Sequence, residues 1–102
     1  PLYVIRIDKQ NNQVILGTEE ELLSKTIYIT DTNILVDSLP NIALGKIRYK
    51  SKPVPCNITI IDDNNIKVEF TEPVKSATPG QSLVLYDNNI LLGGGIIQKV
   101  EK

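Results

Sequence analysis

Four cationic side chains near the middle of the chain are the clearest candidates for binding chemistry, because every second residue there is basic. They are Lys46, Arg48, Lys50 and Lys52. If the segment is a β-strand, these side chains point to one face in a row, roughly 6–7 Å apart. That spacing is close to the distance between successive phosphates on one nucleic-acid strand, so the row suits contacts with an RNA or DNA backbone. It also suits a solvated strand face whose lysines protect a sheet edge from aggregation. The residues alone leave both interpretations open.

Cys56 is the only cysteine, and it is the candidate for a nucleophile or a sulfur carrier. The sequence contains no histidine, so the commonest general base and the commonest metal ligand are both absent. Apart from the basic segment, nothing near Cys56 in sequence would lower the pKa of its thiol. The pattern favours a buried, unreactive cysteine. We therefore predict no catalytic residue and no metal site, and a domain that is not a self-sufficient enzyme.

Three other clusters resemble reactive sites but have simpler structural explanations. The glycines at 93–95 lack the Lys-Ser/Thr pair and the helix of a phosphate-binding loop, so a bulge or a close backbone approach is favoured. Asp62 and Asp63 lie in a run of turn-forming residues, and turn formation accounts for them. Thr18 and Glu21 have capping-box spacing, which predicts a single helical turn at this acidic run.

Composition indicates an ordinary globular domain. The 102 residues carry a formal net charge of −1, so any nucleic-acid binding must come from a local patch. The apolar runs are too short to span a membrane, and no signal segment opens the chain. A lone cysteine suits a reducing, cytosolic setting. We expect residues 1–102 to form one domain, and a first residue that is Pro1 rather than Met indicates a fragment of a longer protein.

Short apolar segments separated by turn residues run along the whole chain. The predicted strands are 3–8, 13–16, 25–30, 46–52, 57–61, 66–70, 83–86 and 90–97. In the segment 66–70, Ile66, Val68 and Phe70 are expected to face inward. Because helical periodicity is almost absent, we predict an all-β domain. A small closed or nearly closed antiparallel β-barrel is favoured, since closure removes exposed edges. A β-sandwich is the second choice.

Turn residues predict where the strands end. Turns are expected at 31–33, 37–41, 62–65, 78–81 and 87–89, and the fourth of these has the proline and glycine positions of a type II turn. Pro53 and Pro55 should interrupt the ladder around Val54, which predicts an edge or a bulge there. Glu72 and Pro73 are expected to end the strand that begins at 66.

Several segments, taken together, resemble one known domain. They are 31–35 (DTNIL), 46–50 (KIRYK), 72–73 (EP), 78–81 (TPGQ) and 92–97 (LGGGII). In this order and rough spacing they are similar to the C-terminal domain of bacterial tRNA-specific 2-thiouridylases (the MnmA type), over essentially the whole chain. Two positions depart from residues common in that family. Ile34 stands where tryptophan is common, and Lys50 stands where arginine is common, which keeps the charge but not the bidentate geometry.

The resemblance implies a fold and a role. In this family the C-terminal domain is a β-barrel, similar to barrels of translation factors, that helps the enzyme hold its tRNA. The complete enzyme uses ATP to adenylate the wobble uridine, and a cysteine persulfide then delivers sulfur to make 2-thiouridine. The N-terminal ATP-pyrophosphatase domain and the central domain hold the catalytic cysteines, so Cys56 corresponds to neither. The resemblance therefore implies a cytoplasmic protein whose partners are tRNA and a sulfur-donor protein, and whose C-terminal domain, residues 1–102 here, has no cofactor of its own.

Three hypotheses follow for the role of the domain. In the first, tRNA is the anionic partner of Lys46, Arg48, Lys50 and Lys52, which contact mainly phosphates because aromatic residues are few. In the second, the domain is structural and packs against the rest of its enzyme through the glycines at 93–95 and nearby apolar residues. In the third, it is an unrelated barrel that binds a protein. A large exposed apolar patch would support the second hypothesis.

Overall fold

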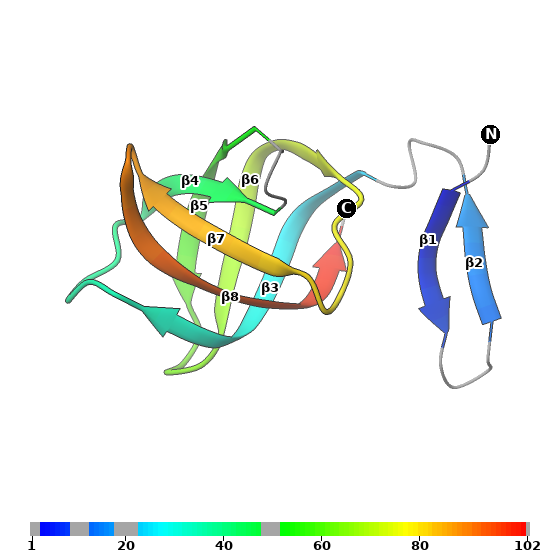
Figure 1. The fold of residues 1–102 in the computed structure, drawn as a ribbon, viewed down its shortest axis with the longest axis horizontal. Helices are drawn as coiled ribbons and strands as arrows, with labels where there is room; N and C mark the ends of the chain where they lie inside the picture. Colours follow the sequence, from blue (N-terminus) through cyan, green and yellow to red (C-terminus); the bar gives the residue numbers. More distant parts are fainter. Residues whose placement is uncertain (1–2, 9–12, 18–22, 48–51, 102) are drawn as a thin grey trace.

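A closed β-barrel forms most of the molecule (Figure 1). The computed structural model describes residues 3–8, 13–17, 23–47 and 52–101. All secondary-structure elements among these residues are β-strands. The barrel strands are β3 (Leu23–Ile34), β4 (Ile42–Lys46), β5 (Val54–Ile60), β6 (Ile66–Lys75), β7 (Ser82–Asp87) and β8 (Ile90–Glu101). Their order around the barrel is β3-β6-β5-β4-β7-β8, with β8 returning to β3, and all neighbours are antiparallel. The predicted all-β class and closed antiparallel barrel are confirmed, and the sandwich alternative is excluded.

The first two strands form a two-stranded sheet of their own. β1 (Tyr3–Asp8) and β2 (Gln13–Gly17) pair antiparallel with one irregularity in their register. Both strands lie where the alternation of the sequence predicts them. The helical turn predicted at Thr18 to Glu21 lies outside the described residues. The barrel itself is therefore built from the chain that begins with β3.

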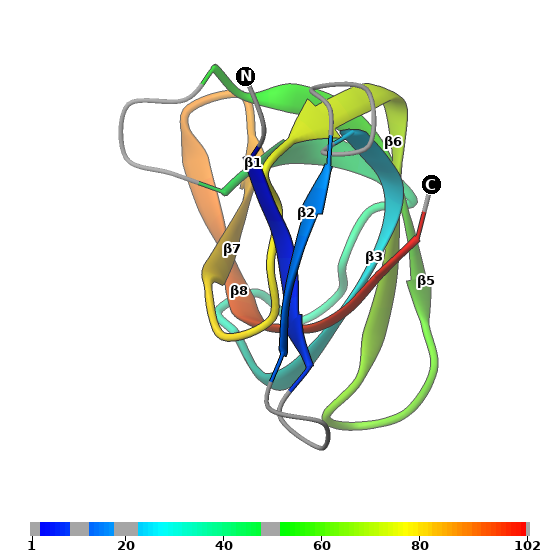
Figure 2. The same cartoon turned by 90° about the vertical axis from the view of Figure 1, so that its right-hand side faces the viewer.

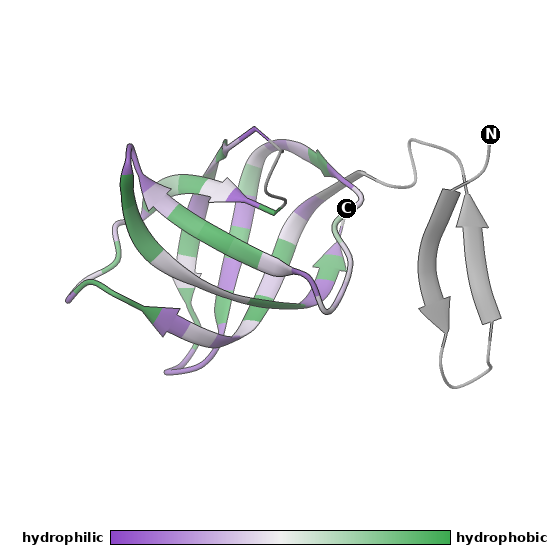
Figure 3. Cartoon of the chain, viewed as in Figure 1, coloured by the Kyte–Doolittle hydropathy of each residue, from purple (hydrophilic) through white to green (hydrophobic). Residues whose placement is uncertain are grey.

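Inward-facing apolar side chains fill the barrel. The least exposed of the large ones are Ile27, Ile29, Cys56, Ile66, Val68, Leu83, Leu85 and Ile97. Along β6 the buried positions alternate, with Ile66, Val68 and Phe70 inside, as predicted. Figure 3 shows this alternation as apolar and polar bands along the barrel strands, and Figure 2 shows the strands curving around a common interior. Burial of each such aliphatic side chain contributes about 1.5–3 kcal/mol.

The glycines at 93–95 lie inside β8, where neighbouring backbones approach closely. A Cβ atom on Gly93 would collide with the carbonyl oxygen of Asn33, and one on Gly94 would collide with the carbonyl oxygen of Leu83. Gly93 also has a φ of 137°, which residues with a side chain rarely adopt. The register of β8 shifts against both β3 and β7 in this region. The predicted bulge and close backbone approach are confirmed.

The turn predicted at 31–33 is wrong, because β3 continues through it to Ile34. Asp31 has a φ of 50°, and the register of β3 against β8 shifts between Thr30 and Asn33. Aspartate tolerates the left-handed conformation, and here that conformation forms an irregularity inside a strand rather than a turn at its end. The pairing with β8 that holds the strand together is not visible in local composition.

Two strand breaks predicted from proline are also wrong. β5 runs through Pro55, which lies opposite Leu44, and β5 is paired on both sides. The missing N–H is tolerated because pairing with β6 begins at the next residue, and the Pro55 carbonyl accepts a hydrogen bond from the Thr71 hydroxyl at 3.2 Å. β6 runs through Pro73 to Lys75, because its register against β3 shifts there and leaves the proline outside the regular ladder.

Two predicted turns are confirmed in their hydrogen bonds. In the 62–65 turn between β5 and β6, the main-chain N–H groups of Asp62 and Asn65 each donate to the other residue's carbonyl, at 3.2 and 3.4 Å. In the 78–81 turn, the Gln81 N–H donates to the Thr78 carbonyl at 3.3 Å, and Gly80 has a φ of 96°. A positive φ at the third position is what a type II turn requires.

Candidate nucleic-acid interface

The basic segment lies between two strands in the sequence. β4 ends at Lys46 and β5 begins at Val54, and neither Ile47 nor Lys52 belongs to a strand, so the strand predicted at 46–52 is wrong at these described residues, while residues 48–51 lie outside the described part of the chain. Gly45 and Val54 lie opposite each other in an antiparallel pair, which requires the chain between them to reverse direction.

The structure places two of the four residues predicted to contact RNA. Lys46 is half-buried at the end of β4, opposite Val84 of β7. Lys52 is exposed shortly before β5 begins. Arg48 and Lys50 lie outside the described residues. The two described cations stand at the two ends of one connection, so both belong to the same end of the barrel.

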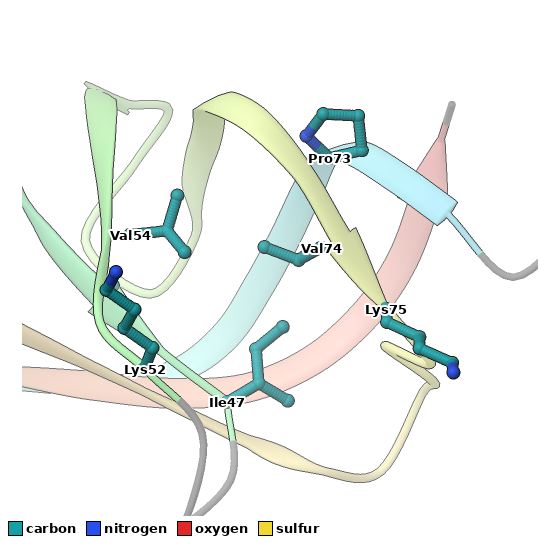
Figure 4. Close-up of a pocket in the computed structure, with 7 residues that line it drawn as sticks. Ile47, Lys52, Val54, Pro73, Val74 and Lys75 are labelled. Carbon is teal, nitrogen blue, oxygen red and sulfur yellow. The ribbon is translucent and has the colours of Figure 1, made fainter.

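A cavity of about 220 Å³ opens at this end of the barrel (Figure 4). It is lined by Gly45, Ile47, Lys52, Val54, Pro73, Val74 and Lys75. Figure 4 shows Ile47, Val54 and Val74 directed toward the same space, with Lys52 at one side and Lys75 at the other. The site combines an aliphatic interior with two cations at its sides. Such an arrangement can hold an anionic molecule that also has an apolar part.

The sequence does not reveal the part of this cavity that β6 contributes, namely Pro73, Val74 and Lys75. These residues are distant in sequence from the basic connection, and the expected strand end at Glu72 and Pro73 leaves them outside any element. The one local signal in the sequence is the apolar Val74 beside the charged Lys75, and in the structure Val74 is buried and Lys75 is exposed. Only the register of the barrel brings these residues beside the β4–β5 connection.

Cys56 is fully buried inside the barrel, and the prediction of an unreactive core cysteine is confirmed. Its thiol donates a weak hydrogen bond to the Ala43 carbonyl at 3.5 Å. Burial raises the pKa of the thiol to about 11, because the thiolate is poorly solvated in an apolar interior. The thiol is therefore protonated at neutral pH and enclosed by the barrel, which does not favour a role as nucleophile or sulfur carrier.

The two aspartates at 62 and 63 belong to a turn, as predicted. The Asp62 carboxylate accepts hydrogen bonds from the Asn64 main-chain N–H at 2.8 Å and from the Asn65 amide at 2.8 and 2.9 Å. These donors, the Asn64 N–H first, lower the pKa of the Asp62 carboxyl group. Within the described ranges, no group of three histidine, cysteine or acidic side chains forms a candidate metal site. No helix among those residues is long and apolar enough to cross a membrane.

A second surface feature is a set of exposed aliphatic side chains around the β8 glycines. Leu35, Leu91 and Ile96 are 57%, 45% and 37% exposed. Together with the glycines at 93–95 they line a shallow depression of about 300 Å³, which shares no residue with the cavity beside the basic connection. Exposed apolar surface of this kind is typical of a contact with another protein surface.

The fold is a closed six-stranded antiparallel β-barrel in which a connection rich in basic residues joins β4 to β5. The chain belongs to the family described as the aminomethyltransferase beta-barrel domain, whose sequence profile matches residues 24–97. That match covers nearly the whole of the barrel, from the start of β3 into β8.

Several relatives of the chain are named tRNA-specific 2-thiouridylase MnmA. The protein from Acetivibrio thermocellus is 45% identical over 101 residues, which cover 96% of this chain and 28% of the relative. The protein from Geobacter metallireducens is 43% identical over 99 residues, 95% of this chain and 27% of the relative. The protein from Clostridioides difficile is 41% identical over 102 residues, 97% of this chain and 28% of the relative. The chain thus spans slightly more than a quarter of the length of these relatives. The resemblance to the 2-thiouridylase C-terminal domain is confirmed, and the hypothesis of an unrelated barrel is excluded.

Proposed function

We propose that this chain is the tRNA-contacting β-barrel of a tRNA-specific 2-thiouridylase, and that residues 1–102 form the C-terminal domain of the larger enzyme. Family membership carries the proposal, together with 45% identity over 101 residues to a protein named for that activity. The activity is the conversion of the tRNA wobble uridine to 2-thiouridine, and the barrel contributes to holding the tRNA.

The contact surface in this proposal is the β4–β5 connection. Lys46 and Lys52 stand at its ends, and Arg48 and Lys50 lie between them in sequence. Because the chain has a formal net charge of −1, attraction to RNA has to come from this local concentration of cations. Lysine and arginine side chains at such a connection contact phosphates and fix the position of the RNA without reading its bases.

The reaction chemistry belongs to other parts of the enzyme in this proposal. The sequence has no histidine, and its one thiol is buried with a pKa of about 11. An N-terminal domain that uses ATP, a central domain and a sulfur-donor protein would carry out adenylation and sulfur transfer, in the cytoplasm. The barrel needs no cofactor for the role assigned to it.

Binding of the chain to unmodified tRNA at several salt concentrations tests the proposal. Four engaged cations should give a log–log slope of affinity against salt of about −3. Replacing Arg48 and Lys50 together with alanine should weaken binding at low salt and reduce the slope to about −1.5. Fluorescence anisotropy of labelled tRNA measures both quantities.

The matched control is Lys67→Ala combined with Lys99→Ala, which removes two cations from β6 and β8. Lys67 lies 3.7 Å from Glu69, and Lys99 lies 4.0 Å from Glu101, so the control changes the net charge equally on a different surface. Binding should be nearly unaffected by it. Equal weakening by both double variants, or binding that ignores salt, would contradict a contact through the β4–β5 connection.

A second candidate role is packing against another domain of the same enzyme, and the exposed aliphatic surface beside the β8 glycines favours it. Replacing Leu91 and Ile96 with aspartate should leave the barrel folded, because both side chains are exposed. In the full-length enzyme the same changes should increase proteolytic cleavage between domains. Unchanged protease sensitivity would exclude a packing role for this surface.

A further inference from the structure

The cavity beside the basic connection has an aliphatic floor that is held in place without a ligand. Val74 is 9% exposed and belongs to the core, and the half-buried Ile47 and Val54 pack against that core. The three side chains come from β6, the β4–β5 connection and β5. Because close packing fixes them from behind, the floor presents a defined apolar surface that a ligand could cover favourably.

Two lysines flank this floor from opposite sides. Lys52 belongs to the β4–β5 connection and Lys75 to the end of β6. Figure 4 shows the Lys75 amine directed outward, away from the three aliphatic side chains. A lysine stem can cover apolar surface while its ammonium group stays in solvent. None of the described residues that line the cavity is acidic. The exposed Lys52 therefore offers its charge to an anion, Lys75 adds positive charge on the opposite side, and the floor attracts apolar surface.

The size of the cavity, about 220 Å³, is well beyond the needs of one ion. A single water molecule requires about 10–15 Å³ on a comparable measure. Gly45 has no side chain and contributes only backbone to the lining of the cavity. The space suits a ring with an attached anionic group rather than an isolated phosphate.

We infer that this cavity is a subsite for one unstacked nucleotide of the bound RNA, with its base or ribose against Ile47, Val54 and Val74 and a flanking phosphate near Lys52 and Lys75. The inference rests on the proposed tRNA contact, which directs the phosphate backbone along the neighbouring connection. Bases withdrawn from a stack are commonly packed on aromatic or apolar side chains.

The cavity selects for single-stranded RNA rather than for a base sequence. Its described side chains are aliphatic except for the two lysines, and these offer no set of donors and acceptors that distinguishes one base edge from another. An acidic peptide with an apolar side chain has a similar distribution of charge. RNA is favoured over it because the cations continue from Lys52 back to Lys46 along the connection.

Val54→Phe tests the inference, because it fills the cavity without removing a cation. The probes are a short single-stranded oligouridylate and a fully paired RNA duplex. The variant should weaken oligouridylate binding about tenfold, and it should leave duplex binding and its salt dependence unchanged. Ile42→Phe is the matched control, since it enlarges an aliphatic residue of β4 that is 66% exposed outside the cavity, and it should change neither affinity.

Ile47→Phe fills the same cavity from the β4–β5 connection and should reproduce the effect of Val54→Phe. Thermal melting shows whether each variant folds, and either folded variant is enough for the test. Unchanged oligouridylate binding in a folded variant overturns the subsite, while intact duplex binding leaves the proposed tRNA contact standing. Equal loss for both RNA forms also overturns it, because an apolar filling should spare phosphate contacts. If the unmodified chain binds neither RNA, the proposed function fails and the subsite fails with it. Binding of an alternating Glu-Leu peptide that Val54→Phe abolishes, without RNA binding, would assign the cavity to an acidic peptide instead.

Discussion

Gly45→Ala is expected to destabilise the barrel, because Phe70 occupies the space that the new methyl group needs. An added Cβ would lie 2.7 Å from Cε1 and 2.9 Å from Cζ of Phe70, and 3.4 Å from Sγ of Cys56. Carbon atoms in favourable contact are about 3.5–4.0 Å apart, so the ring would have to move by about 1 Å. Phe70 is 3% exposed in a close-packed interior. Overpacking of this kind costs about 1–3 kcal/mol.

A smaller effect of the opposite sign accompanies this cost. Gly45 is not among the described residues with a positive φ, so alanine can adopt its backbone conformation. Replacing glycine at such a position stabilises a protein by about 0.4–1 kcal/mol, because the unfolded chain loses conformational freedom. The net loss should be about 1–2 kcal/mol, which lowers the melting temperature of a chain of this size by about 5–15 °C.

A double-mutant cycle with Phe70→Leu identifies the cause of the loss. Leucine lacks the ring atoms that meet the added Cβ, so in that background Gly45→Ala should be neutral or should stabilise by about 0.5 kcal/mol. Urea unfolding of the four proteins gives the interaction free energy, which should be about 1–2.5 kcal/mol. A value near zero, or an unchanged melting temperature for Gly45→Ala alone, would refute the steric explanation.

Gly94→Ala should lower the melting temperature more than Gly45→Ala does, because its Cβ would collide with the main-chain carbonyl of Leu83, which cannot rotate away; a milder effect by circular dichroism would contradict the close backbone approach. Cys56 should resist iodoacetamide until urea unfolds the barrel, and rapid labelling of the folded chain would contradict its burial. Folding raises the pKa of this thiol from 9.0 to about 11. Between these two pH values the thiol is ionised in the unfolded chain but protonated in the folded one, so the free energy of unfolding should fall as pH rises. Cys56→Ala should lack this fall. Asp62→Ala should lower the melting temperature at neutral pH, and the difference should disappear in acid, because a carboxyl group whose pKa is lowered by folding stabilises the folded state only while it is ionised. Asp63→Ala is the control for that comparison, and an equal effect of both changes would show that the turn hydrogen bonds of Asp62 are not the cause.

Much of the barrel could be predicted from the sequence, because apolar and polar residues alternate along a strand that has one face inside the barrel and one face outside. The segment 66–70 shows this, since its apolar positions are the buried ones. The passage of β3 through Asp31 and of β5 through Pro55 could not be predicted in this way. In both cases pairing with a strand far away in sequence overrides the local preference for a turn or a break.

The candidate site was predictable in its charges but not in its shape. Lysine and arginine at every second position are visible in the sequence, and on their own they suit either an anionic partner or a solvated surface. The turn that makes them a connection follows from the pairing of Gly45 with Val54. The aliphatic floor depends on Val74, which reaches the site through an irregular register between β3 and β6. Neither the pairing nor the register has a local signal.

Arg48, Lys50 and Lys52 lie in sequence between the end of β4 and the start of β5, whereas Lys46 is the last residue of β4. Within a strand, the insertion of one residue turns every later side chain to the opposite face. A connection can change its length and its charge at little cost in free energy, since loop closure depends only weakly on length. The residues proposed to contact RNA can therefore change while the barrel stays the same. The barrel could therefore serve as a scaffold for a new anion-binding loop, grafted between Lys46 and Val54.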